Sequence, residues 1–314
     1  MIIVIGEALI DLIQDRENND EYKAVVGGAN ANVAIALARR EANHTFLARI
    51  STDSFGQQIK QKLLKNNVNL DHAIETKEPS TLAVVSINAQ GSPSYSFYVN
   101  GTADWGWTPE ELPNLEAEAI QFGCLTMAME PGNLIIEEWA KAKSHNTTIS
   151  HDINMRPALG FDQAKELKRV NRVNSFSHII KASDEDLEWL DPTKTPDQTA
   201  KEWSQNKLVL ITKGSEGVDV YKDGNLLFNV PSRKINVVDT VGAGDTFTAN
   251  LLGQLQENNH LGTNPTEKLM NLNNDDLHTY VHIAGIAASI NCERAGAEPP
   301  TKADLQALGQ INRD

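Results

Sequence analysis

The chain has 314 residues, of which 40% are hydrophobic and 22% are charged, as is typical of a folded globular protein. Its length fits one α/β domain with an appendage. The net charge of −14 argues against non-specific binding to nucleic acid or to anionic membranes, so an anionic substrate would need local positive groups. No apolar run approaches membrane-spanning length, and the short apolar N-terminus lacks the basic region of a signal peptide.

Cysteine usage indicates a cytoplasmic protein. The two cysteines, Cys124 and Cys292, lie far apart and do not have the spacing of metal ligands. We therefore expect free thiols in a reducing cytoplasm.

The first third of the sequence predicts a strand at 1–6, a short strand at 22–26 and a buried, alanine-rich helix that follows the glycine turn at 27–28. Asp11 stands among apolar residues, where an acid is either a strand-end residue facing water or a ligand for hydroxyl groups. Small residues at the helix start allow a ligand close to the backbone, although tight packing of the helix on a sheet explains them as well.

The next segments alternate between strands and helices, with one interruption. We expect a strand at 44–50, a helix capped by Ser54, a further strand at 119–126 and a helix at 132–144. Between them, residues 81–88 and 94–99 have the pattern of a β-hairpin turning at 89–93. Such a hairpin interrupts the α/β order as an inserted sheet would.

Residues 147–157 are predicted to form a strand that runs into the polar loop Asp152-x-Asn154-x-Arg156. The carboxyl ends of strands are where ligands bind in open α/β sheets. The planar guanidinium of Arg156 suits a phosphate or a carboxylate, while a surface ion pair is an equally good explanation. After the next strand, at 177–182, acids including Asp186 begin a helix, which the helix dipole alone can explain.

The last third is predicted to begin with an apolar strand at 208–212, followed by a glycine-containing turn at 213–217. A hairpin around residues 223–224 comes next. We expect a polar, mobile connection at 256–276 and a helix of small residues at 277–290.

Residues 237–255 combine a strand, a glycine turn and the start of a helix, which together form an anion site. Gly242 and Gly244 allow the backbone to approach a phosphate. Asp245 is unexpected there, because a carboxylate repels anions. It is explained if Asp245 accepts a proton from a hydroxyl that attacks a phosphoryl group; a helix-start Asp favoured by the dipole is the simpler alternative.

Two stretches resemble the signatures of ribokinase-like sugar kinases of the phosphofructokinase B type. The C-terminal one is Asp239-Thr240-x-Gly242-Ala243-Gly244-Asp245-x-Phe247, and the N-terminal one is Gly27-Gly28-x-x-x-Asn32-x-Ala34. The resemblance implies a doubly wound α/β fold with a mostly parallel sheet. It also implies one domain over residues 1–314, with a small β-sheet lid formed by residues from about 12–26 and 80–100.

The resemblance implies an ATP-dependent kinase that phosphorylates a primary hydroxyl of a monosaccharide. The Asp-x-Asn-x-Arg-Pro loop and Ala103-Asp104-Trp105 are similar to fructokinase-like members, so fructose is the expected sugar. Ketodeoxygluconate, ribose and nucleosides remain open, as does a non-catalytic sugar sensor; an oxidoreductase is disfavoured because no dinucleotide fingerprint follows the first strand. The expected partners are the sugar and ATP, with a homodimer formed through the lid.

The resemblance also assigns roles to residues. Asp245 would be the catalytic base, beside an anion hole formed by Gly242, Ala243 and Gly244. The sugar would be bound by Asp11, Gly27, Gly28, Asn32 and Asp245. The nucleotide would be bound by Asn154, Arg156, Lys213, Gly214, Gly217, Gly242 and Gly244. Mg²⁺ would be held through water by Asp186, where relatives have Glu, and K⁺ would lie near Asp239 and residues 292–297. Gly285 stands where relatives carry an Asn that approaches adenine.

Overall fold

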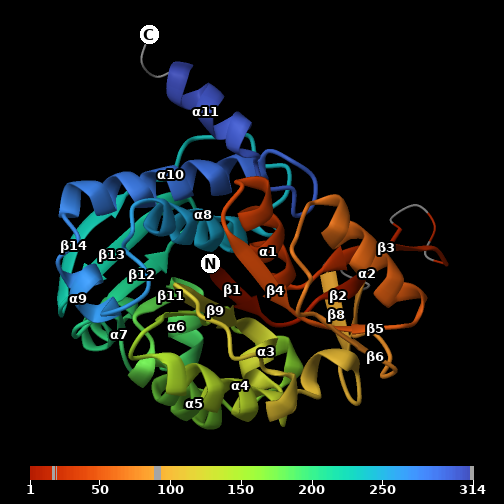
Figure 1. Cartoon of the computed structure of the whole chain (residues 1–314). Coiled ribbons are helices and arrows are strands. Elements are labelled where there is room, and N and C mark those ends of the chain that lie inside the picture. Colours follow the sequence, from red (N-terminus) through yellow and green to blue (C-terminus); the bar gives the residue numbers. More distant parts are fainter. Residues whose placement is uncertain (16–17, 19, 88–92, 312–314) are drawn as a thin grey trace.

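The computed structural model describes all residues except 16, 17, 19, 88–92 and 312–314. A central sheet of eight described strands has the order β14-β13-β12-β11-β10-β9-β1-β4 (Figure 1). The strands from β4 to β12 are parallel, whereas β13 and β14 are antiparallel additions at one edge. Their bounds are β1 (Ile2–Ile5), β4 (His44–Leu47), β9 (Ala119–Gly123), β10 (Thr148–Asp152), β11 (Ile179–Ser183), β12 (Leu208–Thr212), β13 (Val218–Lys222) and β14 (Asn225–Val230).

Both faces of this sheet are buried because helices cover each of them (Figure 1). In β1, Ile2 and Val4 pack in one core cluster while Ile3 and Ile5 pack in another, as expected for a parallel sheet between two helical layers. One layer contains α1 (Ala29–Arg39), α8 (Ala243–Glu257) and α10 (Asn274–Cys292). The other contains α3 (Cys124–Ala128), α4 (Gly132–Lys143), α5 (Gln163–Phe176), α6 (Asp184–Leu190) and α7 (Pro196–Trp203). The predicted doubly wound α/β fold is confirmed.

A second sheet of four described strands has the order β3-β2-β7-β8. Its strands are β2 (Leu9–Gln14), β3 (Tyr22–Gly27), β7 (Leu82–Ile87) and β8 (Pro93–Tyr98). The predicted hairpin is present as the antiparallel pair β7–β8. Of its expected turn at 89–93, residues 89–92 lie outside the described residues and Pro93 begins β8. Ile13, Tyr22 and Tyr98 are exposed on this sheet. Its roles as a lid and as a homodimer contact stay predictions.

Several local expectations were wrong. The strand expected before the glycine turn at Gly242 is absent, because residues 231–240 contain no strand. The strand expected at 44–50 is divided into β4 and β5 (Arg49–Ser51), which pairs with β6 (Ile74–Thr76) in a separate sheet. The N-cap of α2 (Ser54–Lys65) is Asp53, not Ser54; the Asp53 carboxylate accepts the Gly56 N–H at 2.7 Å. The strand expected at 119–126 ends at Gly123, because Cys124, with φ of 51°, begins a helix.

The last one concerns residues 256–276, which are not a simple polar connection. They contain α9 (Pro265–Met270), and the side chains of Leu269 and Leu272 are buried. The chain ends with α11 (Lys302–Ile311). In the described part of the chain, no helix is long and apolar enough to cross a membrane.

Candidate functional site

The start of α8 lies at the carboxyl ends of the central strands and separates two adjoining cavities. Gly242 is its N-cap and has φ of 75°, a left-handed conformation that favours glycine. A Cβ added to Gly242 would lie 2.7 Å from the Cβ of Ala297, so the turn also lacks space for a side chain. The Ala243 N–H donates to the Thr240 carbonyl at 3.2 Å, and the first-turn N–H groups of this helix start together make a local positive end in an acidic protein.

The first cavity has a volume of about 510 Å³ and collects polar residues from five strand ends. They are Glu7 after β1, Cys124 after β9, Asn154 and Arg156 after β10, Lys181 and Ser183 in β11, and Thr212 at the end of β12. The small sheet adds Leu9, Asp11, Ala83 and Phe97 to the opposite wall. The cavity therefore lies between the two sheets, as a substrate site at the edge of an open α/β sheet does.

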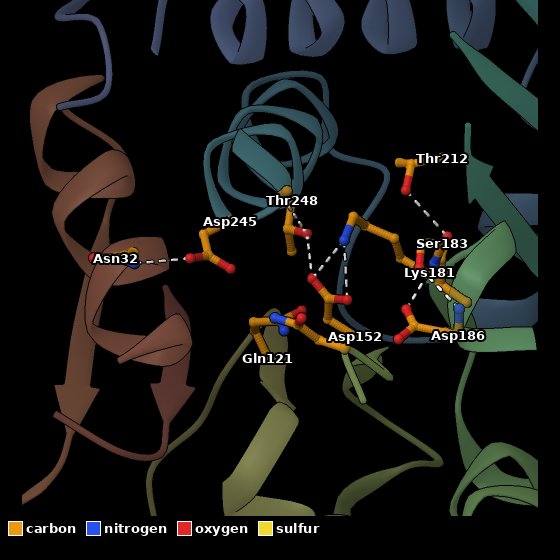
Figure 2. Close-up of polar contacts among 12 residues, drawn as sticks. Asn32, Gln121, Asp152, Lys181, Ser183, Asp186, Thr212, Asp245 and Thr248 are labelled. Atoms are coloured by element: carbon orange, nitrogen blue, oxygen red, sulfur yellow. Dashed lines mark hydrogen bonds and ion pairs between the residues drawn. The ribbon is translucent and has the colours of Figure 1, made fainter. Parts of the chain in front are cut away.

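Asp245 lies in the first turn of α8 and is only 6% exposed. Asn32 of α1 donates its Nδ2–H to the Asp245 Oδ2 at 2.8 Å (Figure 2). Burial raises the pKa of Asp245 to about 7; the Asn32 hydrogen bond opposes that rise and the Asp152 charge adds to it. A carboxylate with a pKa near neutrality can take up a proton during a reaction and release it afterwards.

The N-terminal signature holds a buried network around Glu7. Its carboxylate accepts hydrogen bonds from the Ala29 N–H at 3.0 Å and the Asn30 Nδ2–H at 2.8 Å, and also from Thr126. Gly28, the N-cap of α1, has φ of 105°. A Cβ there would lie 2.6 Å from the Glu7 carbonyl oxygen, so Gly28 lets α1 begin directly against the end of β1. This fixes Asn32 one turn further along.

Asp11 lies in β2 and faces the cavity from the small sheet. Burial raises its pKa to about 6, and the Arg156 charge opposes the rise. A Cβ on Gly27, its neighbour in β3, would lie 2.2 Å from the Asp11 Oδ2. The glycine pair therefore serves two purposes, since Gly27 leaves room for Asp11 while Gly28 permits the start of α1.

Asp104, in the tripeptide similar to fructokinase-like members, has a structural role. Its buried carboxylate accepts the Ala8 N–H at 2.9 Å and the Thr81 Oγ1–H at 2.5 Å. Burial raises its pKa to about 7. Ala8 and Thr81 directly precede β2 and β7, so Asp104 ties both central strands of the small sheet to the main domain.

Arg156 and Asn154 line the first cavity but not the second. The Arg156 Nη1 donates to the Asn154 Oδ1 at 2.5 Å and to the Met155 carbonyl at 2.9 Å. Nearby Cys124 raises the pKa of Arg156, burial opposes this, and Asp245 and Asp186 add to it. The structure thus places Arg156 on the same side of α8 as Asp11 and Asp245, rather than beside the turn at 213–217.

The second cavity, of about 500 Å³, lies on the other side of the α8 start. Its walls include the predicted Gly214, Gly217 and Gly285, and apolar side chains of Val218, Ile235, Val237, Phe247 and Ala288. It shares Thr212, Thr240 and Gly244 with the first cavity. Apolar walls suit the flat faces of a base, and the shared residues lie where its phosphates would reach the first cavity.

Lys213, expected to bind nucleotide, is among the lining residues of neither cavity. Its ammonium lies 3.3 Å from Asp219 and 3.5 Å from Glu216, and hydrogen bonding to Asp219 raises its pKa. Lys181, in contrast, lines the first cavity close to the shared residue Gly244. It lies in β11 and donates to Asp152 at 2.8 Å (Figure 2).

The two expected cation sites differ in what surrounds them. Asp186 lines the first cavity, but its carboxylate oxygens already accept the Met155 N–H at 2.7 Å and the Ser183 N–H at 2.8 Å. The Asp239 carboxylate accepts the N–H groups of Val241 and Gly296, at 3.0 and 2.9 Å. Asp239 therefore joins the turn before α8 to the loop at 292–297, and the K⁺ site expected in that region stays a prediction.

The whole arrangement has counterparts among known proteins. Residues 1–304 match the family model described as pfkB family carbohydrate kinase. The chain is 37% identical over 268 residues to a fructokinase of Rhizobium leguminosarum bv. trifolii, covering 83% of this chain and 81% of the relative. This chain belongs to the pfkB family of carbohydrate kinases. It is therefore a phosphotransferase that acts on a sugar hydroxyl, as predicted.

Solved structures agree on the fold. A fructokinase of Xylella fastidiosa with bound ATP superposes with a TM-score of 0.88 at 24% identity, covering 100% of this chain and 99% of that one. A double mutant of fructokinase from Vibrio cholerae, in a form with fructose, ADP and potassium ion bound, gives a TM-score of 0.82 at 25% identity. That superposition covers 98% of this chain and 97% of the other.

Sequence reasoning did not place Lys181, Asp152 and Glu7 among the site residues. One signal could have identified Lys181, because a lysine inside an otherwise apolar strand is rarely buried without a partner. Asp152 could also have been identified, because it is the acid that begins the Asp-x-Asn-x-Arg loop motif at the end of β10. Glu7 directly follows the first strand, at the edge where ligands bind.

Proposed function

We propose that the protein is a fructokinase that transfers the γ-phosphoryl group of ATP to a primary hydroxyl of fructose. The observation that carries this proposal is the pair of cavities that meet at the start of α8. One contains the polar side chains of Asp11, Asn32 and Asp245. The other has mostly apolar walls with several glycines, and it also contains Arg233 and Lys234. The relatives and solved neighbours named fructokinase support the choice of sugar.

In this reaction Asp245 would take the proton of the attacking hydroxyl, while Asn32 holds its carboxylate in place. The N–H groups at Gly242, Ala243 and Gly244 would bind the oxygens of the transferring group, whose negative charge is spread over them. Asp11 and Arg156 would orient the sugar from opposite walls of the cavity. The small sheet would exclude water, which otherwise competes with the sugar as acceptor.

The substrate can be identified with a panel of fructose, ribose, ketodeoxygluconate and adenosine, each supplied with ATP in a coupled ADP-release assay. We expect the highest kcat/KM with fructose. A higher value for any of the other three would reject fructose while leaving the kinase activity intact. ADP release with none of them, despite sugar binding, would favour the sugar-sensor alternative.

Magnesium fits the donor set of the first cavity. No three His, Cys, Asp or Glu side chains gather into a metal site in the described part of the chain. Mg²⁺ usually keeps several waters and binds through one or two carboxylates together with substrate phosphates. Asp186 can serve such a hydrated ion, which would neutralise phosphate charge when bound.

Replacing Asp186 with alanine should raise the Mg²⁺ concentration needed for half-maximal activity by about tenfold, as is common when an outer-shell ligand is lost. The measurement is a Mg²⁺ titration of the steady-state rate. Ser183→Ala is the matched control, because it removes the other half of the α6 cap without removing a charge. Equal titrations of the parent and Asp186→Ala would show that Asp186 only caps the helix.

Potassium is proposed for the loop region joined by Asp239 and Gly296. Activity should be higher in KCl than in NaCl at equal ionic strength, because carbonyl groups of a loop of fixed size distinguish the two ions. We expect Asp239→Asn to reduce that difference. Identical rates in both salts would remove potassium from the proposal.

A further inference from the structure

Lys181 lies in the middle of β11, where the neighbouring residues Ile179, Ile180 and Ala182 are buried. Its side chain is 9% exposed, and that of its ion-pair partner Asp152 is 7% exposed. The pair joins adjacent parallel strands, because Asp152 and Lys181 are direct partners in the β10–β11 register. A buried ion pair is costly to desolvate and is weak evidence for stability, so its retention here needs another reason.

The pair is oriented toward the site rather than into the core. Lys181 lines the first cavity, and its Nζ lies 3.2 Å from the position that a Cβ on Gly244 would occupy. Among the described residues, the acceptors of Nζ are the two oxygens of Asp152, at 3.0 and 2.8 Å (Figure 2). An ammonium group has three donors, so one remains for a ligand beside Gly244.

Asp152 is itself fixed to the helix that forms the anion hole. Thr248 donates its hydroxyl to the Asp152 Oδ2 at 3.0 Å, and the same Oγ1 lies 3.1 Å from the Gly244 carbonyl (Figure 2). The ammonium of Lys181 and the start of α8 are thus held at a fixed distance by Asp152 and Thr248. Burial has the largest single effect and lowers the pKa of Lys181. The charge and hydrogen bonds of Asp152, together with the charges of Asp245 and Asp186, outweigh it, so the net pKa shift is upward and the group stays cationic.

We propose that Lys181 contacts the phosphoryl group that is transferred, with Asp152 positioning its ammonium beside the backbone of Gly244. The inference deepens the proposed kinase function and rests on it. It assigns to Lys181 the cationic role that the sequence suggested for Lys213, whose side chain is paired with Asp219 and Glu216. Terminal phosphate oxygens would take the third donor of the ammonium while Asp152 keeps the other two.

The test compares the affinities for ATP and ADP, because only ATP carries the transferred group. Lys181→Met alone would leave Asp152 buried without a partner and could unfold the protein. The variant of choice is therefore Lys181→Met combined with Asp152→Asn, which neutralises both groups. Asp152→Asn alone keeps the ammonium, and Lys213→Ala removes a lysine outside both cavities. Calorimetric titrations with each nucleotide, in Mg²⁺ and without sugar, give the ratio of the two dissociation constants.

In the double variant the preference for ATP over ADP should fall by about tenfold, equivalent to 1.4 kcal/mol. Lys213→Ala should keep the parent ratio within about twofold, well inside that change. Asp152→Asn should lose part of the preference for ATP, because it keeps the ammonium but removes the carboxylate that positions it. An unchanged ratio in a folded double variant, or an equal loss in Lys213→Ala, would overturn the role of Lys181. A parent that binds ATP but phosphorylates no sugar would instead reject the proposed function, because the titrations contain no sugar.

Discussion

Replacing Asp245 with asparagine should reduce kcat at least a hundredfold, since loss of a general base typically costs about 10²–10⁴ in rate. The shape of the side chain is kept and the hydrogen-bond partner Asn32 remains. The affinity for ATP should stay within about tenfold of the parent, or 1.4 kcal/mol, because the N–H groups of α8 are untouched. Steady-state kinetics and calorimetric ATP titration measure the two effects separately.

Asp197→Asn is the matched control for this substitution. Asp197 also lies in the first turn of a helix, α7, but outside both cavities. Replacing Asp197 with asparagine should leave kcat at the parent value. If both variants turned over at near-parent rates, Asp245 would be a helix-start residue, and the proposed mechanism would be wrong.

The raised pKa of Asp245 predicts opposite effects of pH on activity and on stability. Because burial raises this pKa to about 7, the parent kcat/KM should fall as the pH drops below 7 and the base becomes protonated. In the unfolded chain an Asp has a pKa of about 3.9, so the folded protein binds the extra proton between the two values. The stabilisation that protonated Asp245 gives to the folded protein is therefore lost as the pH rises through 7.

Asp245→Asn does not titrate, so its melting temperature relative to the parent should be higher at pH 8 than at pH 5. Thermal unfolding at both values tests this. A constant difference between the two proteins would show that Asp245 is not responsible for the pH dependence. The predicted loss of kcat in Asp245→Asn would then be tested by the steady-state kinetics alone.

The sequence predicted correctly those helices and strands that are determined by neighbouring residues in the chain. The apolar run at 208–212 became β12 as expected, and the glycine signatures at 27–28 and 242–244 begin α1 and α8. The division of residues 44–50 was missed because it depends on β6, a partner more than twenty residues away. The strand expected to reach Thr126 stops early at Cys124, whose left-handed backbone no apolar pattern reveals.

Side-chain direction limited the prediction of the site. Lys213 follows the strand that lines the cavities, yet the hairpin brings Asp219 close enough to hold it away. Lys181 was overlooked because its role depends on Asp152. Asp152 lies 29 residues earlier and is brought next to Lys181 only by the pairing of β10 with β11. Residues whose role is set by backbone geometry were easier to recognise, since glycines that permit close approach stand out in the sequence.

Gly28→Ala should cause a large loss of stability. The new side chain would need φ of 105° at that position. Its Cβ would lie 2.6 Å from the Glu7 carbonyl oxygen and 3.1 Å from the Ala8 Cα, both backbone atoms that cannot rotate away. Backbone strain and overpacking each cost about 1–3 kcal/mol, so we expect a loss of about 2–6 kcal/mol in the free energy of unfolding.

Gly101→Ala separates backbone strain from overpacking, because Gly101 has φ of 68° but nothing lies within 4 Å of an added Cβ. It should cost only the left-handed strain, about 1–2 kcal/mol. Gly28→Ala should also weaken sugar binding, since a displaced α1 moves Asn32 away from Asp245. Urea unfolding and the KM for the sugar, measured on both variants, provide the comparison. The contradicting outcome is a Gly28→Ala variant that unfolds at the same urea concentration as Gly101→Ala and keeps the parent KM. That result would show that Asn32 is positioned by something other than the close contact between α1 and β1.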